Sequence, residues 1–404
     1  MKSHMSKILT LMLAVFLVIP AFASAAPTTK GSAADLRSAL GNLLGEHAIL
    51  AINTMQKGYD AKGDFTDAAN ALNMNTADLS KAIASVYGDE AGKSFNTIWS
   101  SHIGYFVDYV KATSAKDNAA KQKAVDNLEK YRFAQAKFFA TANPNLSEKD
   151  LADGLKMHIN ELLKAFDSYV AKDYSTVYKT EREAYAHMLM TGDALAGGIV
   201  KQFPAKFTGD IMNNPASDLR QTLGQLLGEH ASAAVFAMQK GIDGAPDFDQ
   251  AAAVLTMNTN DLSNAIASVY GQDAGKSFNT IWSSHIGYFV DYVKATAAKD
   301  NTAKQKAVDN LEKYRFAQAK FFATANPNLS EKDLAEGLKM HINELLKAFD
   351  SYVAKDYKTV YSLEREAYAH MFMTGDALSE GIVKQFPAKF EPTTTTLLYL
   401  QLLK

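Results

Sequence analysis

Apolar residues recur every three or four positions along most of the chain, which is the period of an amphipathic α-helix. No segment alternates apolar and polar residues in the manner of a strand hairpin. In the first half, the pattern predicts long helices over 34–58, 90–113, 118–140, from Ser147 to Tyr169, and 174–202. A short helix over 78–87 is expected in the region that connects the first two. Long helices joined by short turns predict an all-α fold, an antiparallel bundle of four to five long helices.

Helix breakers and caps support these boundaries. Gly58 follows the first apolar stripe, Pro204 follows the last, and Asn-Pro-Asn at 143–145 separates two stripes. Ser147 begins the next helix, with Asp150 three residues later, an arrangement like a capping box. The predicted helices therefore have defined ends.

A long internal repeat divides the chain. The stretch GKSFNTIWSSHIGYFVDYVKAT begins at Gly92 and again at Gly275, 183 positions later. Repeats of this length indicate tandem copies of one unit. We expect helical-bundle domains over 35–207 and 218–390, joined by a linker over 208–217. The tail over 391–404 matches nothing in the first copy and is expected to be disordered.

The first 25 residues resemble a secretory signal peptide. Lys2 and Lys7 precede an apolar run, and small residues follow at 23–25. The run is too short for a comfortable membrane span. We therefore expect cleavage near Ala26 and a secreted or cell-envelope protein, with no membrane attachment beyond the signal peptide.

Composition narrows the chemistry. The chain has no cysteine, which excludes disulfides, thiolate metal ligands and a cysteine nucleophile. A hydrophobic content of 47% allows it to be held together by core burial instead. The formal net charge of −2 gives no electrostatic reason to expect nucleic acid or an anionic membrane as a partner.

Histidine is confined to four positions in each copy, apart from one in the leader. Each of the four lies near the middle of a different predicted helix, in or beside its apolar stripe. Residues at mid-helix stay at one level whichever way a helix runs, so we expect the four imidazoles in one layer of the bundle. The positions are His47, His102, His158 and His187 in the first copy and His230, His285, His341 and His370 in the second.

Carboxylates accompany these histidines at neighbouring positions or one helical turn away, where both side chains share a face. They are Glu46, Glu161 and Glu183, with Glu229, Glu344 and Glu366 in the second copy. Imidazole with carboxylate suits zinc, copper(II) and iron, the carboxylates being either direct ligands or groups that orient the imidazoles. Nearby methionines at 157, 188 and 190 would add soft donors for copper(I), although core packing is their commoner role. The leading hypothesis is a metal-binding or buffering protein with one site per repeat, copper favoured.

Other interpretations of the histidines remain open. They could form a polar network with tyrosines and carboxylates, and a single histidine on an apolar face is usually a core residue with one hydrogen bond. A di-iron enzyme would use Glu-x-x-His on two helices, whereas the chain has His158-x-x-Glu161 and a longer Glu183-to-His187 spacing. A haem enzyme would hold its haem noncovalently, since Cys-x-x-Cys-His is absent. A further interpretation is a cell-envelope interaction or spacer protein, in which the histidines serve only the core.

Binding is favoured over catalysis. Ser100 and Ser101 lie near His102, but no Gly-x-Ser-x-Gly elbow accompanies them, and no phosphate loop is present. The sequence therefore offers no candidate residues for hydrolytic catalysis, and a di-iron or haem redox enzyme would use the same histidines and glutamates.

Four motifs carry a family resemblance: GEHA at Gly45, WSSHIGYFVDY from Trp99, ANPNLSEKDLADGL from Ala142, and EREAYAHM from Glu181. They are similar to a repeat in secreted proteins of Gram-positive spore-formers that are commonly labelled copper amine oxidase N-terminal domain proteins. That label belongs to a separate β-rich stalk module, which nothing in this sequence resembles. The resemblance covers both copies and implies secretion, but neither amine oxidation nor a copper site in the bundle.

Overall fold

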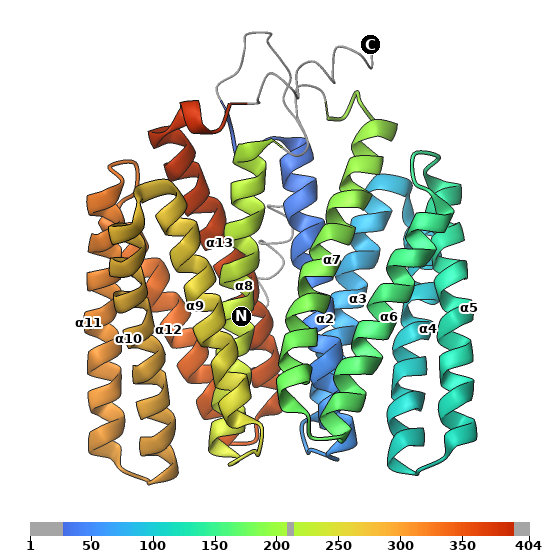
Figure 1. Ribbon diagram of the computed structural model, residues 1–404, viewed down its shortest axis with the longest axis horizontal. Helices are drawn as coiled ribbons and strands as arrows, with labels where there is room; N and C mark the ends of the chain where they lie inside the picture. The colour runs from blue at the N-terminus through green and yellow to red at the C-terminus, as the bar shows by residue number, and fades with distance from the viewer. Residues whose placement is uncertain (1–26, 208–213, 392–404) are drawn as a thin grey trace.

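The computed structural model describes residues 27–207 and 214–391, which fold into twelve α-helices with no strand among them (Figure 1). The first half contains α2 (Ser32–Tyr59), α3 (Phe65–Tyr87), α4 (Asp89–Ser114), α5 (Asn118–Ala142), α6 (Glu148–Val170) and α7 (Tyr174–Gln202). The second half contains α8 (Pro215–Ile242), α9 (Phe248–Tyr270), α10 (Gln272–Ala297), α11 (Asn301–Ala325), α12 (Glu331–Val353) and α13 (Tyr357–Gln385), followed by a short 3₁₀ turn, Pro387–Lys389.

The all-α prediction is confirmed, but each half has six helices rather than four or five. The short helix expected over 78–87 is the end of the 23-residue helix α3. Its first turns bury Ala68, Ala71, Asn75 and Thr76 on the same face as Leu72. Small and polar residues at these buried positions hide the helical period from a pattern of large apolar residues.

The predicted cap at Ser147 is confirmed, whereas Gly58, expected to end the first helix, lies inside α2, one residue before its end at Tyr59. The Ser147 hydroxyl accepts a hydrogen bond from the backbone N–H of Asp150 at the start of α6. Asp117 and Asp173 cap α5 and α7 in the same way, by accepting from the backbone N–H three residues on. Short turns after these helices reverse the chain, so that neighbouring helices run in opposite directions (Figure 1).

The two halves pack against each other along α2, α7, α8 and α13 in the middle of the molecule (Figure 1). Buried apolar residues of both halves belong to one contiguous core cluster. The equivalent residues Tyr185 and Tyr368 meet at the centre, with 3.0 Å between their hydroxyl oxygens. The contact between the copies is thus self-complementary, as in a two-fold symmetric dimer.

Glycines allow the closest helix contacts. A β-carbon on Gly192 of α7 would lie 3.0 Å from the backbone nitrogen of Gly41 on α2. The equivalent distance from Gly375 of α13 to Gly224 of α8 is 2.5 Å. A β-carbon at Gly375 would clash with backbone, and one at Gly192 would require the neighbouring helix to shift by a few tenths of an ångström. Glycine therefore allows these helices to cross closely.

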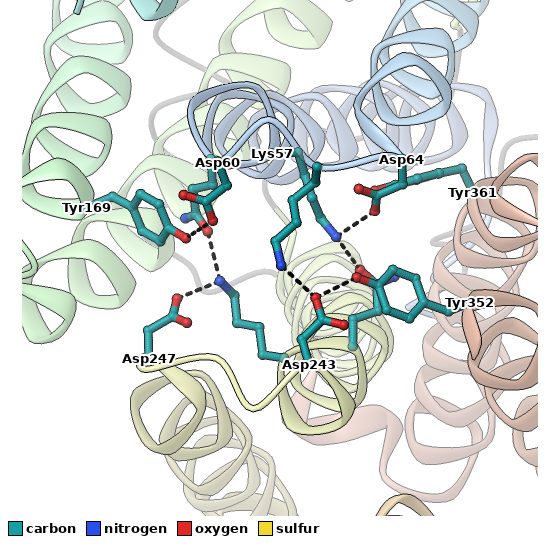
Figure 2. Close-up of polar contacts among 12 residues, drawn as sticks. Lys57, Asp60, Asp64, Tyr169, Asp243, Asp247, Tyr352 and Tyr361 are labelled. Atoms are coloured by element: carbon teal, nitrogen blue, oxygen red, sulfur yellow. Dashed lines mark hydrogen bonds and ion pairs between the residues drawn. The ribbon is translucent and has the colours of Figure 1, made fainter. Parts of the chain in front are cut away.

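Reciprocal polar contacts close one end of the interface (Figure 2). The Lys57 ammonium of the first half donates to Asp64 and, across the interface, to Gln239. The equivalent Lys240 donates to Asp247 and to Gln56. The two lysines and two aspartates of these contacts are therefore paired rather than left buried alone.

None of the helices that the structure describes is long and apolar enough to span a membrane. The predicted signal peptide (1–25) and most of the linker (208–217) and of the tail (391–404) lie outside the described residues.

Candidate metal centre

Three of the four histidines in each half converge in the core. His47 on α2, His102 on α4 and His158 on α6 each offer a ring nitrogen, and these nitrogens lie within 4.8 Å of one another. The side chains are at most 1% exposed. The same arrangement recurs in the second half with His230 on α8, His285 on α10 and His341 on α12. We call each set a three-histidine group.

The closest pair in the group has the spacing of two metal ligands. The Nε2 atoms of His47 and His102 are 3.3 Å apart, and those of His230 and His285 are 3.1 Å apart. Two nitrogens bound at 2.0–2.1 Å to one tetrahedral ion would lie about 3.3 Å apart. The carbonyl oxygen of Trp99 accepts a hydrogen bond from His102 Nδ1, so in the neutral ring the lone pair is on Nε2, facing His47.

Several nitrogens of the group have no protein partner. Nδ1 of His47 and both ring nitrogens of His158 are buried without a hydrogen bond to any described residue, and the second half repeats this at His230 and His341. A buried polar group without a partner costs about 1–3 kcal/mol. The polar network with tyrosines and carboxylates, one of the interpretations of the sequence, would instead supply partners to these atoms.

Aromatic side chains form the walls of the group. The Tyr131 ring stacks on His102 with 4.5 Å between ring centroids, and the Trp99 ring lies 4.8 Å from His47. Trp99, Tyr109 and Tyr131 are buried and Tyr105 is partly buried, in agreement with their assignment to the core. The Tyr131 hydroxyl has no hydrogen-bond partner among the described residues, so its ring, rather than its hydroxyl, makes the contact with the group.

Burial keeps the imidazoles neutral. It lowers the pKa of His102 to about 3, and that of His285 to the same value. The pKa values of His47 and His158 are also well below the ordinary value, because of burial and because each lies close to other imidazoles of the group. Neutral imidazole is the form that binds metal ions, so these rings need lose no proton to become ligands.

The fourth histidine lies outside the group. His187 on α7 places Nδ1 3.0 Å from a carboxylate oxygen of Glu161 on α6, and His370 pairs with Glu344 at the same distance. The predicted layer of four imidazoles is thus a layer of three with a histidine–carboxylate pair beside it. The mid-helix position of His187 predicts its height along the bundle, but it does not predict the direction in which its side chain points around the axis of α7.

The structure does not bring the remaining predicted carboxylates to the groups. Glu46 accepts two hydrogen bonds from the Arg365 guanidinium of the other half, and Glu229 is paired with Arg182 in the reciprocal contact. Glu183 is half exposed, with its nearest cation, that of Lys179, at 3.8 Å. Its counterpart, Glu366, accepts a hydrogen bond from the hydroxyl of Ser362. Ion pairing across the interface, a role that the sequence analysis missed, explains Glu46 and Glu229.

The methionines near the histidines divide between core and surface. Met188 is buried in a cluster of apolar side chains, whereas Met157 and Met190 are exposed. Neither three-histidine group includes a carboxylate among the described residues. The donor atoms that each group brings together are three imidazole nitrogens.

No protein-family model, curated protein or solved structure matches this chain.

Proposed function

We propose that this protein binds one transition-metal ion in each half, with His47, His102 and His158 as ligands in the first site. His230, His285 and His341 form the second. The fourth coordination position of each ion is left for water or another small ligand, because only three protein donors converge. The role that fits such buried sites is metal binding or buffering.

The observation that carries the proposal is the state of His158. Its ring is neutral, fully buried and bonded through neither nitrogen to any described residue, within 4.8 Å of two other imidazole nitrogens. Binding an ion would give the one lone pair of the neutral ring a partner and so remove part of the cost of burying it unbonded. A histidine that served only the core would be expected to have at least one hydrogen bond.

The donor set limits the metal. Three imidazoles without a carboxylate suit zinc and copper(II), and the order of affinities among divalent metals favours copper. A di-iron centre would require the carboxylates that are engaged elsewhere. Haem fits poorly, because the imidazole rings are packed with centroids 5.3 and 5.6 Å apart and are enclosed by aromatic side chains.

We propose that the protein acts outside the cytoplasm, because its first 25 residues resemble a secretory signal peptide. The resemblance to secreted proteins of Gram-positive spore-formers points the same way.

The test is the metal content of the untagged protein, measured by plasma mass spectrometry after purification and after exposure to Cu²⁺ or Zn²⁺. We expect about two ions per chain, one for each set of three ligands. His102→Ala should remove one ion and His102→Ala/His285→Ala both, while Glu183→Gln, which changes an exposed carboxylate on α7, should remove none. A protein that stays empty after each exposure would refute the proposal.

A further inference from the structure

A histidine–carboxylate pair lies at the outer edge of each three-histidine group. The side chains of His187 and Glu161 are 12% and 15% exposed, whereas the three histidines of the neighbouring group are at most 1% exposed. In the second half, His370 and Glu344 have the same exposures within one percentage point. The pair therefore lies between solvent and the sealed interior of the helix bundle.

This pair adjoins His158. Glu161 follows His158 by three residues on α6, which places the two side chains on neighbouring positions of one helix face. Nε2 of His187 lies 3.9 Å from the β-carbon position of Gly154, which precedes His158 by one turn of α6. Both nitrogens of His158 lack a protein partner, so the ring that the pair adjoins is free to bind.

The carboxylate also orients the imidazole. Glu161 accepts a hydrogen bond from Nδ1 of His187, so in the neutral ring the lone pair is on Nε2. This nitrogen faces the turn of α6 at Gly154, where a β-carbon would lie 3.9 Å away. Gly154 is in the interior of a helix, where glycine costs about 1 kcal/mol relative to alanine, and its missing side chain leaves room beside Nε2.

We infer that His187 with Glu161, and His370 with Glu344, form an outer metal-binding station through which a divalent transition-metal ion reaches the three-histidine group. The inference rests on the proposed function. A hydrated ion cannot enter a sealed apolar core without losing its water, which is costly for a charge. The partly exposed imidazole, oriented by Glu161 through Nδ1, replaces a water ligand through Nε2 before the ion passes to His158.

Two tryptophans allow the transfer to be observed. Trp99 and Trp282 are the only tryptophans of the chain, and the ring of each lies 4.8 Å from a histidine of its group. Cu²⁺ bound by the group should quench their fluorescence. Stopped-flow mixing of the metal-free full chain with Cu²⁺ then gives the rate of loading, and equilibrium titration gives the affinity.

In His187→Ala/His370→Ala we expect the loading rate to fall about tenfold or more. The three-histidine groups should still bind two copper ions per chain, with an affinity within about threefold of the original protein. An unchanged rate would overturn the inference. A large loss of affinity would also overturn it, because the histidine would then be a ligand of the inner ion. If the original protein shows no quenching and binds no copper, the proposed function itself fails.

Two further variants separate access from folding. Glu183→Gln/Glu366→Gln removes carboxylates one turn from the same histidines and should load at the original rate. Gly154→Leu/Gly337→Leu fills the space beside Nε2 while improving helix propensity, so it should slow loading in a protein that remains folded. Loading at the original rate in the leucine variant would contradict an ion path past Gly154.

Discussion

The contact between the halves can be tested at Arg365. Its guanidinium donates two hydrogen bonds to Glu46, at 2.9 and 3.0 Å, and a third to Asp78. The side chains of Arg365 and Glu46 are 9% and 6% exposed. Arg365→Met keeps most of the apolar stem but leaves a carboxylate buried without its cation.

Breaking a buried ion pair by removing one partner costs about 3–5 kcal/mol, far more than a solvated pair contributes. Asn75 continues to donate to Glu46 at 2.7 Å and offsets part of this loss, so we expect the lower half of that range, about 3–4 kcal/mol. The reciprocal variant Arg182→Met should lose less, because the Arg182 side chain is 24% exposed and water can solvate the site.

The assay is urea unfolding of the metal-free full chain at pH 7, followed by circular dichroism. A double variant, Glu46→Gln/Arg365→Met, removes the orphaned charge and should recover about 2 kcal/mol of the loss. If Arg365→Met costs less than about 1 kcal/mol, the pair behaves as a solvated surface contact and the packing of the halves described here is wrong.

Three further predictions concern buried groups. Burial and a neighbouring carboxylate raise the pKa of Glu364 to about 8, so the stability gained from its protonation in the folded state is lost as pH rises through that value. In urea unfolding, the free energy of unfolding of Glu364→Gln should therefore equal that of the original protein near pH 5 and exceed it at about pH 9. Gly375→Ala should destabilise the protein by about 1–3 kcal/mol and lower the midpoint of thermal unfolding, because its β-carbon would meet backbone. Gly287→Ala, with open space around it, should raise the midpoint. Equal effects of the two variants would contradict the described crossing of α8 and α13. Tyr131→Phe/Tyr314→Phe should stabilise the metal-free chain by about 1 kcal/mol, since it keeps the stacked ring and deletes an unbonded buried hydroxyl; a loss of stability would show that the hydroxyl has a partner.

The sequence predicts much of the fold because its signals are local. Apolar periodicity and caps locate most helices to within a few residues, and the repeat identifies the two halves. The first part of helix α3 is not predicted, because its buried face contains alanine, asparagine and threonine. Periodicity detects large apolar side chains, whereas close packing against a neighbouring helix uses small ones.

The sequence predicts only part of the candidate site. Mid-helix spacing gives the level of each histidine along the bundle, and three of the four per half do meet. It does not give the rotation of each helix, which directs His187 toward Glu161. Nor does it show that Glu46 faces the other copy, because its partner, Arg365, is 319 positions away.

The most direct test of the central claim is an anomalous difference map from crystals of the full chain loaded with Cu²⁺ or Zn²⁺. We predict one strong peak in each half, about 2.0 Å from the coordinating nitrogens of His47, His102 and His158 and of their counterparts His230, His285 and His341. A main peak at His187 and Glu161, or no peak at the three-histidine groups of a fully loaded protein, would contradict the account.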